Sequence, residues 1–381
     1  MLVGCWKSGA PLAGRNFEQV SPKFSNNNEF LYLTNRDGAG TSNDPDGQII
    51  PPLRASQISK SQAFIKRGRM ATTRVSINFL TIQFFLPILI YRTMTRNILM
   101  HRSNADINKL KIINYYNAMK DFFDKYCLRD LAIHNGYWDN RTISYEQSLK
   151  RMVQILSDVS ELKETDLVLD SGFGFGGSSI WIAERIGARV IGITIVEHQV
   201  DIARKMAKER KVDHLTTFKI MDFCKTDFED ATFDVVWALE SAAYASNKLD
   251  FLRESHRILK YGGRIVIADG FIMKDSLTDR ESSEMRWIEG LAIPNFSTVT
   301  QFEKYLKDLN FHNIRFRDIS ENVLHSAKII NEFAKQKYEE WRSDPPAGNY
   351  KILKQHLRSL IAQLKPFEEH VWGYGIFSAT K

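Results

Sequence analysis

The segment at residues 167–179 limits the fold of this chain more than any other. A short apolar run ends in Asp170, glycines follow at Gly172, Gly174 and Gly176, and the next residues are typical of the first turns of a helix. Glycine adopts positive φ readily, and it has no Cβ to keep a ligand away from the turn. A helix start also offers backbone N–H groups without partners inside the helix. The segment therefore predicts a strand, a turn and a helix that hold a cofactor.

Predicted strands and helices alternate after this loop. Further strands are expected at 189–194, 216–221, 233–239 and 263–268, and helices at 197–211 and 248–259. Such alternation is typical of a parallel sheet covered by helices. Ligands bind at the carboxyl ends of the strands in such sheets. Those ends carry Asp170, Thr194, Asp222, Glu240 and Asp269.

Two helices are expected before the glycine loop, in a position to lie over it. Apolar residues recur at helical spacing from 106 to about 127. Ser144 and Gln147 predict a capping box for a second helix that ends at Val159. The loop between these helices, residues 134–139, is rich in side chains that donate hydrogen bonds or stack.

Residues 1–100 differ in character from the rest. Residues 1–60 hold half of the prolines and show no sustained periodicity, which predicts disorder. An apolar run at 77–91 is shorter than the roughly 20 residues of a spanning helix. It is expected to belong to a non-native leader, and a membrane-surface anchor is the alternative. Of the basic and acidic residues, twelve and five precede Met100, which leaves forty of each in the body.

The net charge of +7 therefore lies in the leader and predicts no nucleic-acid surface on the body. The three cysteines are far apart and form no Cys-x-x-Cys pair. This usage fits a reducing compartment and favours a cytoplasmic location.

Five motifs occur in the order typical of class I S-adenosylmethionine-dependent methyltransferases, and the chain resembles that family over residues 104–381. They are the glycine loop and the segments 192–203, 221–223, 233–237 and 261–267. The chain is most similar to the branch that includes tocopherol, sterol and prenyl diphosphate C-methyltransferases. This second likeness is carried by Tyr115-Tyr116 and by the segments 134–138, 237–244 and 318–323.

The resemblance implies S-adenosylmethionine as the cofactor. The implied cofactor-binding residues are Tyr116, Asp170, Gly172, Gly174, Gly176, Thr194, Gln199, Asp222 and Phe223, with the last two at the adenine. Gly172 and Gly174 are expected against the methionine part of the cofactor, and Tyr116 is expected to reach its carboxylate. Thr194 and Gln199 are expected to face the ribose. Most class I enzymes carry an acid where Thr194 stands, so Gln199 gains importance here.

Methyl transfer from a sulfonium is an in-line displacement, so positioning supplies much of the rate. Methylation of an alkene carbon leaves a carbocation, which needs π faces or carboxylates and then a base. Glu240 is the expected base, and Tyr244 is expected to orient the acceptor or stabilise positive charge. Burial would raise the pKa of Glu240, whereas a nearby sulfonium favours its anion. The alternative is that Glu240 only hydrogen-bonds a backbone amide or the cofactor.

The segment after residue 268 is expected to add a helical cap at about 275–370. Helices are predicted at 283–291, 300–309, 323–341 and 350–364, and strands at 312–319 and 372–380, the last antiparallel as in the family. His134, Trp287 and Phe296 are the expected acceptor contacts, although core packing also accounts for the two aromatic residues. A diphosphate on the acceptor would require basic residues and Mg²⁺. The candidates are Arg286, His312, Arg315 and Arg317.

The sequence thus predicts an α/β protein with a doubly wound, Rossmann-like methyltransferase sheet and a helical cap in one domain at 101–381. The expected activity is carbon methylation of an isoprenoid, with a prenyl diphosphate as the leading acceptor, and the carbocation is expected to be deprotonated or quenched by ring closure. The alternatives are a tocopherol-like ring, a sterol or a small amine as acceptor, or a cofactor-binding interaction module that uses the leader to reach a membrane. The oligomeric state does not follow from the sequence.

Overall fold

The computed structural model describes residues 103–128, 131–346 and 349–381. The predicted leader at 1–100, with its apolar run at 77–91, lies outside this part of the chain. None of the helices in the described ranges is both long enough and apolar enough to cross a membrane.

In the described residues, seven strands form one sheet in the order β3-β2-β1-β4-β5-β7-β6. They are β1 Leu167–Ser171, β2 Arg189–Thr194, β3 Thr216–Ile220, β4 Phe233–Leu239, β5 Leu259–Ile272, β6 His312–Asp318 and β7 Trp372–Thr380. Strands β1 to β5 pair in parallel, and β7 lies antiparallel between β5 and β6. This topology confirms the predicted Rossmann-like sheet with its antiparallel last strand.

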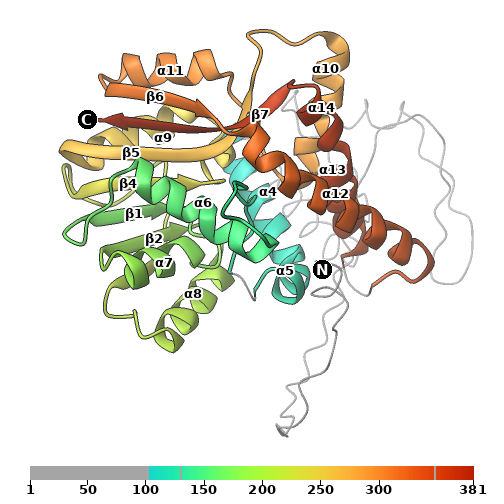
Figure 1. Cartoon of the computed structure of the whole chain (residues 1–381), viewed down its shortest axis with the longest axis horizontal. Helices are drawn as coiled ribbons and strands as arrows, with labels where there is room; N and C mark the ends of the chain where they lie inside the picture. The colour runs from blue at the N-terminus through green and yellow to red at the C-terminus, as the bar shows by residue number, and fades with distance from the viewer. Residues whose placement is uncertain (1–102, 129–130, 347–348) are drawn as a thin grey trace, which may run out of the picture. The chain divides into compact units, whose positions relative to one another are not determined.

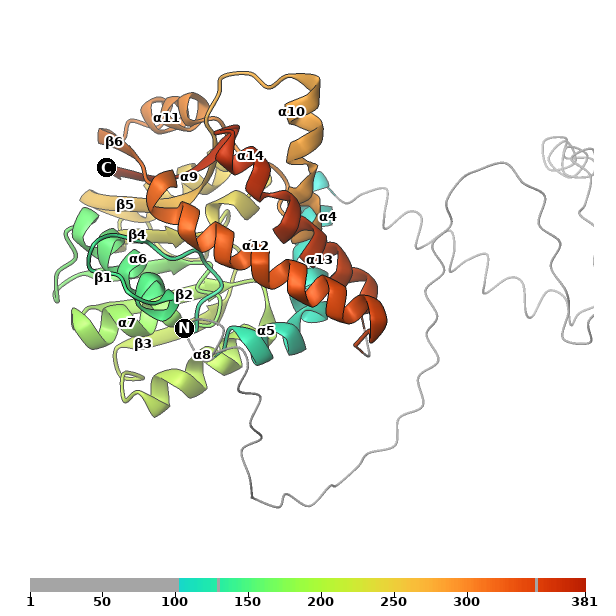
Figure 2. The same cartoon turned by 45° about the vertical axis from the view of Figure 1, so that its right-hand side comes forward.

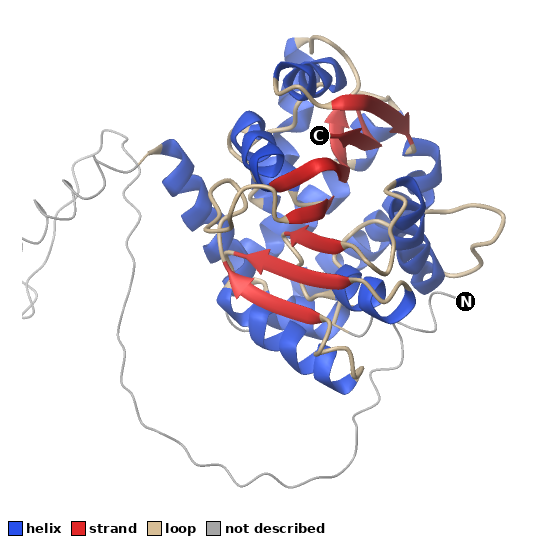
Figure 3. Cartoon of the chain, turned by 90° about the vertical axis from the view of Figure 1, so that its left-hand side faces the viewer, coloured by secondary structure: helices blue, strands red, loops and turns tan. Residues whose placement is uncertain are grey.

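Helices lie on both sides of the sheet (Figure 3). The α-helices are α4 Asn104–Ala118, α5 Lys120–Tyr126, α6 Tyr145–Val159, α7 Gly177–Arg185, α8 Glu197–Glu209, α9 Lys248–Ile258, α10 Asp279–Glu284, α11 Val299–Asp308, α12 Ser320–Ser343, α13 Tyr350–Ala362 and α14 Leu364–Glu368. Two 3₁₀-helices are η1 Ala242–Tyr244 and η2 Met285–Leu291.

Three helices differ in detail from the prediction. The helix expected from 106 to about 127 is divided into α4 and α5 at Met119, which is fully buried. The helix expected at 283–291 is the end of α10 followed by the 3₁₀-helix η2. Ser144 caps α6 as predicted, but the Gln147 side chain accepts from the N–H of Ile143 at 3.1 Å, so the capping box is not reciprocal.

Both faces of the sheet are buried, because apolar residues occupy consecutive positions along the central strands and consecutive residues face opposite sides. Val168, Val235 and Val266 pack in one cluster with residues of α6 and α7. Leu169 and Ile265 point to the opposite face, where they pack with residues of α9 and α11. Parallel strands need this double covering, and it leaves the carboxyl ends of the strands as the place for a ligand.

A helical cap lies at those carboxyl ends (Figures 1 and 2). Helices α12 and α13 pack side by side, and α13 also contacts η2 and α4. Helix α11 falls within the segment predicted to form the cap, but it packs against α9 and β6 at the far end of the sheet. The cap is therefore built mainly by η2, α12, α13 and the N-terminal helix α4.

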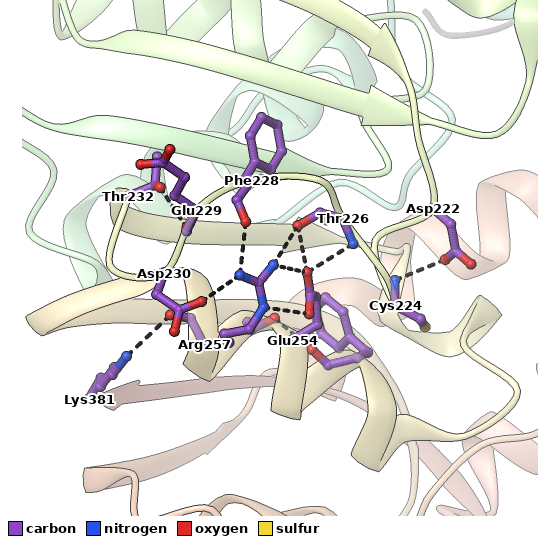
Figure 4. Close-up of polar contacts among 12 residues, drawn as sticks. Asp222, Cys224, Thr226, Phe228, Glu229, Asp230, Thr232, Glu254, Arg257 and Lys381 are labelled. Carbon is purple, nitrogen blue, oxygen red and sulfur yellow. Dashed lines mark hydrogen bonds and ion pairs between the residues drawn. The ribbon is translucent and has the colours of Figure 1, made fainter.

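A network around Arg257 ties the end of α9 to the loop between β3 and β4 (Figure 4). The guanidinium donates to both carboxylate oxygens of Glu254, at 2.6 and 3.1 Å. It also donates to Asp230 Oδ1 at 2.7 Å and to the carbonyl of Phe228 at 2.8 Å. Glu254 in turn accepts from the N–H of Thr226 at 2.8 Å. The network thereby fixes the loop that follows Asp222.

Arg257→Ala is expected to lower the free energy of unfolding by about 2 kcal/mol, because it leaves Glu254 and the Phe228 carbonyl without their charged donor. Arg253→Ala on the same helix removes an exposed ion pair with Asp250 and is the matched control. It should cost less than about 0.5 kcal/mol. Urea unfolding of both variants measures the difference, and equal losses would contradict a structural role for the network.

Candidate active site

A cavity of about 520 Å³ opens at the carboxyl ends of the parallel strands. Its wall includes the glycine loop, the segment after β4, and residues of α4, η2, α13 and β7. The sequence-predicted site residues in the wall are Tyr116, His134, Asp170, Gly172, Gly174, Thr194, Gln199, Asp222, Phe223, Glu240, Tyr244, Trp287 and Phe296. Gly176 is the exception. It is the N-cap of α7, and a Cβ there would lie 2.9 Å from the Cβ of Ala203, so it allows α7 to pack against α8.

The glycine loop forms a cradle that side chains would fill. Gly172 has φ +93°, and a Cβ at this position would lie 2.6 Å from the Cβ of Ser241. The hydroxyl of Ser241 is enclosed and has no hydrogen-bond partner among the described residues. Asp170 is fixed behind the loop, where it accepts from Ser179 Oγ at 2.6 Å, and burial raises its pKa to about 7. An open cradle beside an unpaired hydroxyl fits the methionine part of S-adenosylmethionine.

The end of β2 carries a hydroxyl and an amide that orient each other. Thr194 Oγ1 donates to Gln199 Oε1 at 2.7 Å and accepts from the N–H of Val196 at 3.2 Å. Both Thr194 and Gln199 are buried, and the amide nitrogen of Gln199 remains as a donor. This pair suits the hydroxyls of a ribose.

The end of β3 positions an acid next to an aromatic ring. Asp222 accepts from Lys109 Nζ at 2.5 Å and from the N–H of Cys224 at 2.9 Å. The ring of Phe223 packs edge-on against Phe251, with centroids 5.2 Å apart. Lys109, on α4, was not predicted as a site residue. The arrangement fits the expectation that Asp222 and Phe223 hold the adenine.

Glu240 connects three distant segments of the chain. Its Oε1 accepts from the backbone N–H of Asn135 at 2.6 Å, from Asn135 Nδ2 at 3.0 Å and from Tyr374 Oη at 2.8 Å. No described residue donates to Oε2. Burial raises the pKa of Glu240, and the three hydrogen bonds lower it in part. The carboxylate is therefore fixed through one oxygen, and the other has no donor among the described residues.

The backbone at Glu240 has φ +50°, which is unfavourable for a residue with a side chain. The segment that follows is fixed from two sides. Asp269 accepts from the N–H of Ala243 at 2.8 Å, and Lys248 Nζ donates to the carbonyls of Ala243 and Ala245 at 2.7 and 2.6 Å. Burial lowers the pKa of Lys248. These contacts hold η1 and maintain the strained conformation that directs Glu240 to the cavity.

A chain of hydroxyl groups runs along one side of the cavity. Tyr116 Oη donates to Tyr244 Oη at 3.1 Å, and Tyr244 Oη donates to the carbonyl of Leu291 at 3.2 Å. Burial raises the pKa of Tyr116 to about 12, so both phenols stay neutral. Tyr116 was predicted to reach the cofactor, and Tyr244 was predicted to orient the acceptor or stabilise positive charge. The hydrogen bond shows that these two residues are neighbours in the cavity wall.

Aromatic rings form another part of the wall. The centroid of Trp287 lies 5.8 Å from that of Phe296 and 4.9 Å from that of Trp372. Trp372 and Tyr374 both line the cavity, since alternate residues of a strand face the same way. We call the part of the cavity lined by Trp287, Phe296 and Trp372 the apolar chamber. Glu240 accepts a hydrogen bond from Tyr374, which lies two residues from Trp372 on β7.

His134 lies in the wall in its neutral form. Its Nδ1 is 2.9 Å from the carbonyl oxygen of Asn135, so Nδ1 carries the proton and donates. Burial lowers its pKa to about 4. The other ring nitrogen is consequently an acceptor. His134 thus carries no charge at neutral pH, and its role as an acceptor contact stays a prediction.

The predicted phosphate ligands lie elsewhere. Arg286 is largely exposed and pairs with Glu289, and Arg315 and Arg317 are exposed on the edge strand β6. None of these three lines the cavity. In the described ranges, no group of three or more His, Cys, Asp and Glu side chains is arranged to hold a metal ion.

Comparison with known proteins gives the family. The family model "Methyltransferase domain" matches residues 169–267. The 27-O-demethylrifamycin SV methyltransferase of Amycolatopsis mediterranei is 30% identical over 267 residues, which cover 70% of this chain and 95% of the relative. The sterol 24-C-methyltransferase of Saccharomyces cerevisiae is 30% identical over 214 residues, covering 55% of each chain.

The same fold occurs in solved structures. Geranyl diphosphate C-methyltransferase from Streptomyces coelicolor, solved with Mg²⁺, geranyl diphosphate and S-adenosyl-L-homocysteine, superimposes with a TM-score of 0.56. It is 19% identical, and the match covers 73% of this chain and 99% of that one. With the glycine cradle, the sheet order and these relatives, the chain belongs to the class I S-adenosylmethionine-dependent methyltransferases.

Proposed function

We propose that this enzyme methylates an alkene carbon of an isoprenoid-type acceptor and that Glu240 removes the proton afterwards. The observation that carries the proposal is the asymmetry of the Glu240 carboxylate. Oε1 is saturated by three donors, whereas Oε2 has no partner among the described residues, and Glu240 lines the cavity. A carboxylate that only served structure would not need to leave one oxygen free beside an apolar chamber.

The residues divide the work between binding and proton transfer. S-adenosylmethionine, when bound, supplies an electrophilic methyl group, and the glycine cradle, Gln199 and Asp222 are the groups expected to hold it. The alkene π electrons would form the new C–CH₃ bond while the bond from that methyl group to the sulfonium sulfur breaks, which leaves a neutral thioether as leaving group and a carbocation on the acceptor. Tyr374 and Trp372 offer π faces to that positive charge. A neighbouring C–H bond then breaks, its electrons form the new double bond, and its proton passes to Glu240 Oε2.

The apolar chamber supports an isoprenoid as acceptor, since Trp287, Phe296 and Trp372 provide contact area and few charges. The name of the sterol relative supports carbon methylation of such a molecule. A prenyl diphosphate, the leading acceptor from sequence, remains one candidate, and a tocopherol-like ring is another.

An acceptor panel tests the proposal. The full chain is incubated with methyl-labelled S-adenosylmethionine and Mg²⁺, and with geranyl, farnesyl and geranylgeranyl diphosphates, their alcohols, a tocopherol and a sterol. Mass spectrometry should detect an isoprenoid that has gained one labelled carbon. Cofactor binding without transfer to any isoprenoid would contradict the proposal.

The rate of transfer should fall at acid pH, since the base acts only when deprotonated. Because burial raises the pKa of Glu240, kcat/KM should decline at a higher pH than an ordinary carboxyl would cause. Tyr374→Phe removes a hydrogen bond that stabilises the ionised Glu240 carboxylate, so it should raise the pKa of Glu240 further. The decline of kcat/KM should then move to a still higher pH. Profiles of kcat/KM against pH for both proteins measure the shift. An unchanged acid limb in Tyr374→Phe would exclude Glu240 as the titrating group.

A further inference from the structure

Helix α13 and its C-cap residue bring two polar residues to the wall of the cavity. His356 and Gln363 both line the cavity, and Leu360 lies between them on the same helix face. They are 5% and 6% exposed. Seven residues of helix separate them by roughly 10 Å along the axis. Neither residue was found from the sequence, because nothing local distinguishes them from other polar residues of an amphipathic helix.

Both side chains retain hydrogen-bonding capacity. His356 Nδ1 lies 2.8 Å from Tyr115 Oη, and burial lowers the pKa of the ring to about 3, so His356 is neutral. Its Nε2 has no hydrogen-bond partner among the described residues. The side-chain amide of Gln363 has none there either, although its backbone carbonyl accepts from Trp372 Nε1 at 3.1 Å. Neither group is fully enclosed, so both are available to water or to an acceptor molecule in the cavity.

The charges of the cavity limit what that ligand can be. The basic residues that line the cavity in the described ranges are Lys109, Lys225 and Arg253. Lys109 is paired with Asp222, whose backbone also pairs with that of Lys225, and Arg253 is paired with Asp250 on α9. A buried diphosphate requires cationic partners. A hydroxyl or carbonyl oxygen requires only neutral donors and acceptors, which an imidazole and an amide supply.

We propose that His356 and Gln363 bind an uncharged oxygen function of the acceptor, a hydroxyl or a carbonyl. The enzyme then selects a neutral, oxygenated isoprenoid over a prenyl diphosphate. This inference rests on the proposed function, because it names the acceptor class of the same site.

Ligand binding to the full chain, saturated with S-adenosylhomocysteine, tests the inference by calorimetry. The probes are farnesol, the hydrocarbon farnesene and farnesyl diphosphate. Farnesol should bind roughly tenfold more tightly than farnesene, the difference expected of one or two buried hydrogen bonds, and more tightly than the diphosphate. Tighter binding of the diphosphate than of farnesol would overturn the inference.

Two variants assign the effect to the residues. His356→Phe and Gln363→Met keep side-chain volume and remove hydrogen bonding. Each should weaken farnesol binding roughly three- to tenfold and leave farnesene binding unchanged. His356→Phe also removes the hydrogen bond between His356 and Tyr115, whereas Gln363→Met leaves that hydrogen bond intact. Gln355→Met, at an exposed position of the same helix, is the control. An unchanged farnesol-to-farnesene ratio in both variants would also overturn the inference.

Binding and turnover separate this inference from the proposed function. Preference for farnesol without methyl transfer to any isoprenoid would leave the inference standing and refute the proposed function. Methyl transfer to an isoprenoid, without preferred binding of farnesol over farnesene, would support the proposed function and overturn the inference.

Discussion

Glu240→Gln is expected to bind S-adenosylmethionine as tightly as the native chain and to lose methyl transfer by roughly 10²–10⁴-fold, the usual contribution of a general base. The substitution is nearly isosteric. Its Oε1 can still accept from Asn135 and Tyr374, while an amide nitrogen replaces the oxygen that would take the proton. Calorimetry of cofactor binding and single-turnover rates measure the two effects separately.

Glu289→Gln is the matched control for this change. Glu289 lies on η2 and is largely exposed in a pair with Arg286, so its charge is removed without touching the cavity. It should transfer methyl groups at the native rate. Full activity of Glu240→Gln on the true acceptor would refute the assigned base, and lost cofactor binding would instead assign Glu240 to the cofactor.

Gly172→Ala is expected to abolish cofactor binding. A Cβ at this position would meet the Cβ of Ser241 at 2.6 Å and would stand in the cradle that fits the methionine part. The φ of +93° adds strain of about 1–2 kcal/mol for any residue with a side chain. Cofactor binding measured by calorimetry should fall below detection, while circular dichroism should still report a folded chain.

Gly262→Ala separates strain from steric exclusion. Gly262 also has positive φ, at +76°, but a Cβ there would meet no atom within 4 Å. It should lose a similar amount of stability from strain alone and bind the cofactor as the native chain does. Equal cofactor affinity of the two variants would contradict the assignment of the cradle.

The sheet could be predicted closely because its signals are local. Strands β2, β4 and β7 begin and end at the predicted residues, since apolar runs bounded by turn residues determine them. The break at Met119 has no such signal. Met119 is fully buried in a cluster with Tyr115 and Phe123, so packing with distant residues decides where α4 ends.

Sequence motifs predicted the residues of the site that belong to local segments. They did not predict hydrogen bonds between residues that are far apart in the sequence. The glycine loop and the strand ends predicted residues that line the cavity, and their contacts with the cofactor stay a prediction. The partners of Glu240 are 105 residues away at Asn135 and 134 residues away at Tyr374, and His356 meets Tyr115 across 241 residues. Sequence spacing contains no information on such contacts, which only the fold brings together.

The most direct test of the central claim is the position of the transferred methyl group. The product formed with S-adenosylmethionine carrying a ¹³C-methyl group is isolated, and its ¹³C NMR spectrum is recorded. The account predicts a labelled methyl resonance bonded to carbon, in a product that has lost one acceptor hydrogen. A labelled methyl group on oxygen or nitrogen would contradict carbon methylation.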